Sequence, residues 1–355
     1  MYTGYLEIDC LETPPMKNAI PETRFATRCH DWLQQQWYQT ETPSSLLLPL
    51  EKLFRQAVRA RRTAYAAGAR KTVRLPVPVI VIGNITVGGV GKTPLVIWLA
   101  RELIARGLKP GIISRGYGGR RSTLPLRVYP DSDPLEAGDE PVLIAQKTGC
   151  PVVVAKKRAL AGQYLLAVAD CDVVIADDGL QHYALERNVE IAVMDGFRPL
   201  GNGHLLPAGP LREPPERLSE VNRVIYSGTG PVGETVMTLQ GDMAINLADP
   251  TRRRPLRDFQ DQPCYALAGI GHPGRFFSHL ENHGLQPETR AYPDHYAYCP
   301  NDLNRPQDWP VFMTEKDAVK CTRFADARCW SVPVDASLPP GTADSLYQLI
   351  SGKKS

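Results

Sequence analysis

The chain carries a strand, a glycine-rich loop and a helix in immediate succession, and this succession constrains its fold more than any other feature. Residues 77–84 read VPVIVIGN, a β-branched apolar run of strand length, and residues 85–107 continue as ITVGGVGKTPLVIWLARELIARG. In this order the backbone N–H groups of the loop and the N-terminus of the helix cradle phosphate groups. We expect Lys92 to reach the β- and γ-phosphates of a nucleotide and the Thr93 hydroxyl to bind Mg²⁺.

The loop departs at one position from the G-x-x-x-x-G-K-[ST] pattern of phosphate-binding loops, because Thr86 stands where the first glycine is usual. The remaining glycines still leave the backbone free to wrap a phosphate, since glycine adopts conformations that other residues avoid. The residues expected to contact the nucleotide through this loop are Thr86, Val87, Gly88, Gly89, Val90, Gly91, Lys92 and Thr93.

A second buried strand ends in two neighbouring carboxylates. Residues 171–182 read CDVVIADDGLQH, so Asp177 and Asp178 follow an apolar run directly. Ligands of parallel α/β sheets bind beyond the carboxyl ends of the strands, which places this pair to hold Mg²⁺ or its water shell. Paired aspartates can also be ordinary turn formers. His182, four residues on, is either a hydrogen-bonding neighbour of this site or a loop residue.

Other apolar runs alternate with helical segments along the chain. Strands are predicted at 109–114, 151–155, 189–196 and 222–228, and a helix at 156–169. Strands that alternate with helices favour a parallel sheet with right-handed crossovers. The predicted fold class is therefore α/β, with a parallel sheet like that of P-loop NTPases.

A small net charge conceals a strongly basic segment. The chain has 41 Lys and Arg against 38 Asp and Glu, and the net charge of +3 does not indicate a nucleic-acid binder. Residues 51–74 contain eight Lys or Arg and one acid, a net charge of +7 that leaves −4 for the rest of the chain.

The same region predicts an amphipathic helix over 46–62. Arg55, Arg59 and Arg62 fall on one face, and apolar residues recur on another. Such a helix can lie in a lipid interface beside anionic headgroups. An ordinary helix that packs its apolar stripe on the core and exposes its arginines to solvent has the same pattern. The apolar positions are Leu46, Leu50, Leu53, Phe54, Ala57 and Val58.

Several classes of protein are not indicated. No apolar run reaches the roughly 18 residues that a membrane span requires. The first residues lack a basic segment followed by an apolar one, so no signal peptide is predicted. The eight cysteines form no CxxC pair and no zinc-binding spacing, which favours a reducing cytosol. Residues 1–25 are polar and lack periodicity, and we expect them to be a disordered extension.

Three loops carry charged residues among glycines and prolines, where scaffolds often place function. They read SRGYGGR (114–120), GDEP (138–141) and LLPAGPLREP (205–214). Their arginines can bind phosphate and their acids can bind metal or act as bases, although each alone is more typical of a turn. The candidates are Arg115, Asp139, Glu140, Arg212 and Glu213.

Taken together, the motifs resemble those of the tetraacyldisaccharide 4'-kinase family of lipid A biosynthesis. The resemblance extends from about residue 46 to about residue 335 and leaves out the first 25 residues. Any one motif is weak, but eight in the same order are specific. They are VGGVGKTP (87–94), SRGYGGR, GDEP, DDGLQH (177–182), LLPAGPLREP, AGIGHPGRFF (268–277), the Asp294–His295 pair and TEKDAVK (314–320).

The resemblance implies an activity, a set of partners and a location. The activity is ATP-dependent phosphorylation of the 4'-hydroxyl of a tetraacylated glucosamine disaccharide 1-phosphate, which gives lipid IVA. The partners are ATP, Mg²⁺, the lipid A disaccharide precursor and the cytoplasmic face of the bacterial inner membrane, which the enzyme joins peripherally, with no role for nucleic acid.

The resemblance also assigns roles to residues at matching positions. It implies that Lys92 and Thr93 bind ATP and Mg²⁺ and that Lys92 takes part in catalysis. Asp139 matches the catalytic base, with His295 as its partner in a dyad. Val90 departs from the small polar residue that is more common in the family at that position. The residues implied near the metal or the phosphates are Asp177, Asp178, Arg212 and Glu213.

The family's architecture implies two α/β/α domains joined by a β-ribbon hinge, with the nucleotide in the cleft between them. We predict a P-loop domain over 26–224, the hinge over 225–262 and a smaller α/β domain over 263–355. The last helix, near 342–351, can pack on either domain.

Two other functions stay open at this point. One is a P-loop switch protein, such as a partitioning-type ATPase or a GTP-binding maturation factor, although Val87 stands where the partitioning ATPases carry a lysine. The TEKD motif also lacks the N/T-K-x-D spacing that reads guanine. The other is a membrane-binding module without activity, which the basic helix alone permits.

Overall fold

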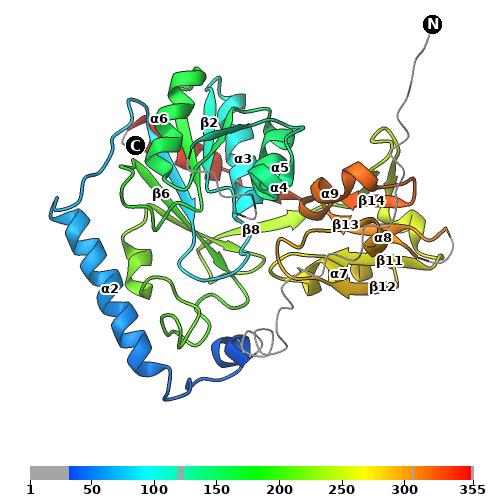
Figure 1. Cartoon of the computed structure of the whole chain (residues 1–355), viewed down its shortest axis with the longest axis horizontal. Helices are drawn as coiled ribbons and strands as arrows, with labels where there is room; N and C mark the ends of the chain where they lie inside the picture. Colours follow the sequence, from blue (N-terminus) through cyan, green and yellow to red (C-terminus); the bar gives the residue numbers. More distant parts are fainter. Residues whose placement is uncertain (1–31, 118, 120–123, 306–307, 353–355) are drawn as a thin grey trace, which may run out of the picture.

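The computed structural model describes residues 32–117, 119, 124–305 and 308–352. The extension predicted at 1–25 lies outside these residues. These described residues form two sheets, each with its own helices (Figure 1). We call the nine-stranded sheet with its helices the large lobe and the six-stranded sheet with its helices the small lobe.

The large sheet has the strand order β15-β8-β7-β6-β1-β5-β2-β4-β3. Its neighbouring strands pair in parallel except β3 with β4 and β8 with β15, so the predicted α/β fold with a parallel sheet is confirmed. The strands are β1 (Val79–Gly83), β2 (Pro110–Ser114), β3 (Leu126–Val128), β4 (Val152–Val154), β5 (Val173–Asp177), β6 (Val189–Asp195), β7 (Arg223–Ser227), β8 (Thr235–Gln240) and β15 (Asp335–Ser337).

Helices cover both faces of this sheet, which explains why its central strands are apolar along their whole length. Ile80 and Ile82 of β1 pack in the core under α3, whereas Val79 and Val81 belong to the core under α6. The helices of this lobe are α2 (Leu48–Ala66), α3 (Lys92–Ala105), α4 (Pro134–Ala137), α5 (Asp139–Thr148), α6 (Arg158–Val168) and α10 (Thr342–Ser351), with the 3₁₀ turn Pro215–Ser219.

The small sheet has the order β10-β9-β14-β13-β11-β12 and a core in which Phe259 meets Phe312 and Trp330 edge-on. Its strands are β9 (Met243–Asn246), β10 (Arg253–Pro255), β11 (Cys264–Ala268), β12 (Pro287–Ala291), β13 (Val311–Thr314) and β14 (Cys329–Val332). Its helices are α7 (Pro273–Asn282), α8 (Pro300–Leu303) and α9 (Glu315–Cys321), with 3₁₀ turns at Leu256–Phe259 and Thr322–Phe324.

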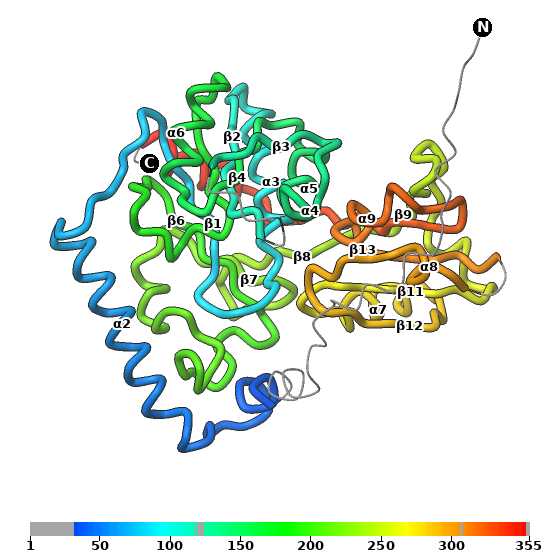
Figure 2. The backbone as a smooth tube through the Cα atoms, viewed as in Figure 1, coloured from blue at the N-terminus to red at the C-terminus, as the bar shows by residue number. Residues whose placement is uncertain are grey.

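The chain passes between the lobes twice, through a two-stranded ribbon. β8 leads from the large sheet to β9, and β15 brings the chain back from β14 and pairs with β8 in antiparallel fashion (Figure 2). The predicted domain boundaries at residues 224 and 262 do not match the way the strands divide between the two sheets. β8 lies within the segment predicted as the hinge, and β15 and α10 lie within the segment predicted as the small domain, yet both strands extend the large sheet and α10 packs against α3. The reason is that the large sheet takes its last strand from the returning chain.

The predicted helix at 46–62 corresponds to α2, which lies along the outside of the large lobe (Figure 1). A polar contact attaches the helix to the rest of the lobe: Glu51 is buried and accepts a hydrogen bond from the Leu205 backbone at 3.2 Å. Within the helix, Glu51 also accepts a hydrogen bond from Arg55 at 2.6 Å. Phe54 packs against the core. No helix among the described residues combines the length and the apolar character that a membrane span requires.

Candidate active site

The glycine-rich loop leads from β1 to α3 as predicted and is held in place through its backbone. Gly91 caps α3 with a positive φ of 89°, a conformation that favours glycine. Thr86 forms a β-bridge with Leu211, and the Val87 N–H donates to the Pro210 carbonyl at 2.8 Å. The LLPAGPLREP segment therefore serves as the scaffold of the loop.

Lys92 at the start of α3 lies between an amide and a carboxylate. Its Nζ donates to Asn84 Oδ1 at 3.1 Å and lies 3.4 Å from Asp178 Oδ1. Asn84 is fully buried, and its amide donates to the Thr86 carbonyl at 2.8 Å. Sequence reasoning missed Asn84, although a polar residue directly after a buried strand was a usable signal. Thr93 follows Lys92 and is half-buried.

The carboxylate pair lies at the carboxyl end of β5, next to the loop. Asp177 is buried: its Oδ2 accepts from the Ser114 hydroxyl at 3.0 Å, and its Oδ1 finds no hydrogen-bond partner within the described part of the chain. Asp178 has a positive φ of 47° and lies 3.4 Å from Arg212 Nη1 as well as from Lys92. The structure thus brings together Lys92, Asp178 and Arg212.

The pKa values of the two aspartates shift in opposite directions because their surroundings differ. Burial, with the negative charges of Glu140 and Asp178, raises the pKa of Asp177 to about 7. Burial acts in the same direction on Asp178, but the positive charges of Lys92 and Arg212 outweigh it and hold the pKa of that carboxyl well below its usual value. A buried carboxylate oxygen without a partner beside an ionised one fits a divalent cation.

Ligands for such a cation must come partly from elsewhere. The described residues contain no group of three or more His, Cys, Asp or Glu arranged to hold a metal. Glu213 is buried and contacts the Tyr183 hydroxyl, Gln181 Nε2 at 3.3 Å and Arg217 Nε at 3.7 Å. Its chain neighbour Arg212 lies 3.4 Å from Asp178 Oδ1 and connects Glu213 to the Asp178 cluster.

Arg158 positions the carboxylate pair from behind, and sequence reasoning missed it. Only 2% of it is exposed, and its guanidinium donates to the Asp177 carbonyl at 3.1 and 3.3 Å and to the Ala155 carbonyl at 3.2 Å. Burial lowers its pKa to about 10, so it keeps its charge at neutral pH. Burial, together with that charge, also lowers the pKa of His182 to about 3, so this histidine is neutral.

Replacing Arg158 by Met is expected to lower the free energy of unfolding by about 2–4 kcal/mol, because buried carbonyl oxygens lose their donors. Urea unfolding monitored by circular dichroism measures the change. Arg257→Met, at an exposed arginine, is the control and should stay within about 0.5 kcal/mol of the unsubstituted chain. Equal stability of the two variants would contradict the assigned role.

A second cluster pairs an aspartate of the large lobe with a histidine of the small lobe. Asp139 begins α5, and His295 lies between β12 and α8 with a positive φ of 60°. The His295 Nδ1 lies 2.9 and 3.1 Å from the two oxygens of Asp139, which is 3% exposed. The Tyr117 ring lies 4.8 Å from the imidazole.

Each member of this pair stabilises the charged form of the other. Burial would raise the pKa of Asp139, but the hydrogen bond from His295 and the charges of Lys316 and Lys320 hold it below its usual value. Burial would lower the pKa of His295, but the hydrogen bond to Asp139 raises it. The predicted dyad residues therefore meet as a buried hydrogen-bonded pair. Glu140, the neighbour of Asp139, contributes to the raised pKa of Asp177, which places the two clusters within electrostatic reach.

The small lobe also touches the glycine-rich loop directly. A Cβ built on Gly271 would lie 2.8 Å from the backbone nitrogen of Gly89, so this approach requires glycine. Beside it, Arg275 of α7 pairs with Asp195 at the end of β6 at 2.5 Å. The loop that starts at Gly269 thus lies over the phosphate-binding loop.

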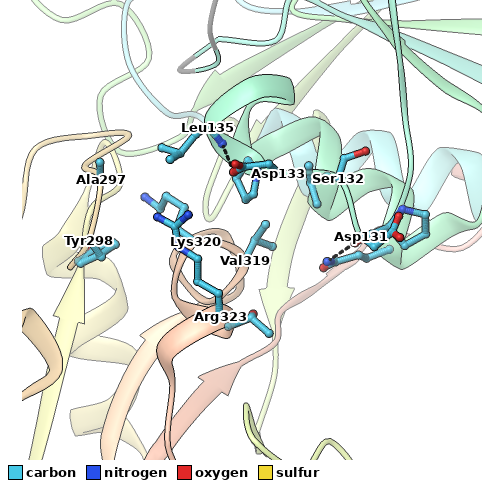
Figure 3. A pocket seen from close by; sticks show the side chains of 14 residues that line it. Asp131, Ser132, Asp133, Leu135, Ala297, Tyr298, Val319, Lys320 and Arg323 are labelled. Atoms are coloured by element: carbon cyan, nitrogen blue, oxygen red, sulfur yellow. Dashed lines mark hydrogen bonds between the residues drawn. The ribbon is translucent and has the colours of Figure 1, made fainter. Parts of the chain in front are cut away.

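A cavity of about 360 Å³ is lined by residues of both lobes (Figure 3). Leu135 and Val142 line it from the large lobe, and Tyr298, Lys320 and Arg323 from the small lobe. Lys320 Nζ lies 3.6 Å from Asp139 Oδ2, so the cavity adjoins the carboxylate from the side of α9.

Comparisons with known proteins point to one family along most of the chain. A family model described as tetraacyldisaccharide-1-P 4'-kinase matches residues 43–351. A protein of Nitrosococcus oceani named tetraacyldisaccharide 4'-kinase is 50% identical over 314 residues, which are 88% of this chain and 93% of that protein. A protein of Haemophilus influenzae with the same name is 48% identical over 305 residues, 85% and 91% of the two chains.

Among solved structures, LpxK from Aquifex aeolicus in complex with ATP superposes with a TM-score of 0.71 at 28% sequence identity. The match covers 85% of this chain and 98% of that one.

Proposed function

The chain belongs to the tetraacyldisaccharide-1-P 4'-kinase family, and from this premise we propose how its two clusters perform the reaction. It is an ATP-dependent kinase that transfers the γ-phosphate to the 4'-hydroxyl of tetraacyldisaccharide 1-phosphate and forms lipid IVA. The observation that carries the mechanism is that the small lobe touches the phosphate-binding loop of the large lobe and also supplies His295 to the buried Asp139 of that lobe.

In this mechanism the loop binds ATP. The backbone N–H groups of residues 88–93 surround the β- and γ-phosphates, whereas that of Val87 is donated to the Pro210 carbonyl. Lys92 neutralises the charge that develops during transfer. The Nζ of Lys92, at the start of α3, is held beside the loop by Asn84 and Asp178. Arg212, which pairs with Asp178, is close enough to the loop to add a second cation beside the phosphates.

Magnesium fits the carboxylate end of the site. Asp177, with its unpartnered buried oxygen, and Asp178 would hold it together with Thr93, and Glu213 would support it through the network around Arg212. The bound ion would supply positive charge to neutralise the phosphate groups of the nucleotide. A site with few carboxylate ligands among the described residues suits Mg²⁺, which usually keeps several waters and is bound through one or two carboxylates together with substrate phosphates.

Asp139 acts as the base that takes the proton of the 4'-hydroxyl. A sugar hydroxyl is a weak nucleophile at neutral pH, so a carboxylate that removes its proton during transfer assists the reaction. The lowered pKa of Asp139 keeps it ionised, and His295 holds its orientation. Because the two residues come from different lobes, contact between the lobes assembles the site and excludes water.

The lipid acceptor brings the enzyme to the cytoplasmic face of the inner membrane, and α2 is proposed as the docking element. Leu46, just before the helix, is 80% exposed, and Leu50 and Leu53 on the helix are 53% and 65% exposed rather than packed on the core. Lys52 and Arg59 are exposed on the same helix. An exposed leucine row beside basic residues is typical of an interfacial helix.

Two of the three arginines expected to face headgroups have partners within the chain. Arg55 pairs with Glu51 at 2.6 Å, and Arg62 pairs with Glu220 at 2.5 Å. The leucines therefore provide a cleaner test of docking than reversal of the arginine charges.

Replacing Leu46, Leu50 and Leu53 together by Ser is expected to weaken binding to vesicles that contain anionic lipid by at least about tenfold, since the apolar area that enters the interface is lost. Co-sedimentation measures the binding, and the affinity for ATP should not change. A triple replacement of Val232, Leu239 and Leu349, which are exposed elsewhere, is the matched control. Unchanged co-sedimentation of the leucine variant would contradict docking by α2.

The activity itself is tested with radiolabelled ATP and tetraacyldisaccharide 1-phosphate, with product separated by thin-layer chromatography. Label at the 4' position of the lipid is the expected result. Hydrolysis of ATP without an acceptor would favour a switch protein, and the absence of both reactions would favour a membrane-binding module.

A further inference from the structure

Helix α9 of the small lobe packs against α4 and α5 of the large lobe (Figure 1). It brings Lys316 and Lys320 to the surroundings of the dyad. The helix is fixed at its start: the Thr314 side chain caps it by accepting from the Asp317 N–H, and Asp317 in turn accepts from the Gly269 N–H at 3.1 Å. Lys316 lies in the first turn, and only 15% of its side chain is exposed.

The contacts of Lys316 are with the chain neighbours of both dyad residues. Its Nζ donates to Glu140 Oε1 at 3.0 Å and to Asp294 Oδ1 at 3.0 Å. Glu140 follows Asp139 in the large lobe, and Asp294 precedes His295 in the small lobe. One ammonium group therefore joins the two backbone segments that carry the dyad.

We propose that Lys316 is a positioning residue that holds the Asp139–His295 pair in its reactive arrangement across the two lobes. This inference rests on the proposed function, in which Asp139 takes the proton of the acceptor. Lys316 acts through the dyad and does not touch the reacting atoms.

The charges around the dyad show why this cation is needed. Asp139, Glu140 and Asp294 bring three carboxylates together. The basic side chains that contact these carboxylates are His295, Lys316 and Lys320. The Nζ of Lys320 also lies 2.9 Å from Asp317 Oδ1, so its charge is divided between two carboxylates. Without Lys316, the carboxylates of Glu140 and Asp294 would repel the base and each other. Removal of one partner from a buried ion pair leaves the other charges uncompensated.

The same charges fix the direction of a pH effect. The positive charge of Lys316 contributes to the lowered pKa of Asp139 and acts against the raised pKa of His295. Loss of that charge raises both pKa values. If the active form has Asp139 ionised and His295 protonated, both limbs of the pH profile of kcat move to higher pH. The two limbs belong to the coupled pair rather than to either residue.

A lysine that only ties the lobes together would behave otherwise, and the chain contains such a lysine. Lys147 of α5 pairs with Glu315 of α9 at 2.7 Å, and 19% of its side chain is exposed. It joins the same two helices as Lys316 but contacts no neighbour of the dyad. Lys147→Gln is therefore the matched control.

The experiment measures kcat, the KM for ATP and the pH profile of lipid phosphorylation for Lys316→Gln, Lys316→Arg and Lys147→Gln. We expect Lys316→Gln to lower kcat by about 10- to 100-fold, with the KM for ATP within about twofold and both limbs shifted to higher pH. Lys316→Arg should return the limbs to their positions in the unsubstituted enzyme, and Lys147→Gln should leave them there.

Two further measurements separate the possible outcomes. Adding Glu140→Gln to Lys316→Gln removes an uncompensated carboxylate and should recover part of kcat, and circular dichroism verifies that each variant is folded. A purely structural role predicts that Lys316→Gln lowers kcat at every pH and leaves both limbs of the pH profile in place. That result would overturn the inference. If the unsubstituted enzyme labels no lipid, the proposed function fails instead.

Discussion

Replacing Lys92 by Ala is expected to lower kcat for lipid phosphorylation by about 10³-fold or more while the chain stays folded. The transferred phosphoryl group carries its charge on its equatorial oxygens, and a cation aimed at them before the reaction stabilises the transition state without reorganisation. Lys92 is aimed in this way, since Asn84 Oδ1 and Asp178 Oδ1 lie 3.1 and 3.4 Å from its Nζ. Single-turnover assays with radiolabelled ATP measure the loss.

The control for this substitution is Lys109→Ala, which removes an exposed lysine paired with Asp170 at the surface. Surface ion pairs contribute little, so this variant should keep both its activity and its stability. Loss of Lys92 also removes a positive charge from the phosphate-binding loop, so weaker binding of the anionic nucleotide is expected together with the fall in kcat. A Lys92→Ala enzyme with turnover within about tenfold of the unsubstituted one would contradict the role of the loop.

The parallel sheet could be predicted from the sequence because its physics is local. A buried parallel strand is apolar along its length, and the runs that became β1, β5 and β6 show this. The division of the chain was harder to predict. β15 is a three-residue strand, DAS, whose place in the large sheet depends on pairing with β8 almost a hundred residues earlier. No periodicity in three residues indicates such a partner.

The site shows the same contrast between local and distant signals. The loop, Asp177 and Asp178 were found from strand ends and glycine spacing. The pairing of Asp139 with His295 came only from the family resemblance, since 156 residues separate them. Arg158 stands in the segment KKRA, whose composition is typical of a solvated helix start, and its burial follows from contacts with a different strand.

Lys316 illustrates why supporting residues escape sequence reasoning even when their motif is noticed. TEKDAVK was recognised as a family motif, but its spacing contains nothing that indicates which lysine meets which carboxylate. Lys316 reaches Glu140 in the other lobe, 176 residues away. That contact exists only because the ribbon of β8 and β15 brings α9 against α5.

Replacing Asp139 by Asn is expected to lower kcat by about 10²- to 10⁴-fold, the range that general-base catalysis contributes. The amide preserves the shape of the side chain but cannot take a proton from the 4'-hydroxyl. Binding of ATP should change little, because the contacts of Asp139 are with His295, Lys320 and the Glu140 backbone rather than with the loop. Steady-state assays over a range of lipid and ATP concentrations separate kcat from the two KM values.

The dyad makes a sharper version of this test possible. If Asp139 and His295 act as a unit, adding His295→Ala to Asp139→Asn should cost little beyond the first substitution, since the effects of residues that act together are not additive. Asp133→Asn, at the N-cap of the nearby helix α4, is the control and should keep its turnover. Additive losses in the double variant would show that His295 acts apart from the base. Turnover of Asp139→Asn within about threefold of the unsubstituted enzyme would remove Asp139 as the base and leave catalysis to the loop and the metal.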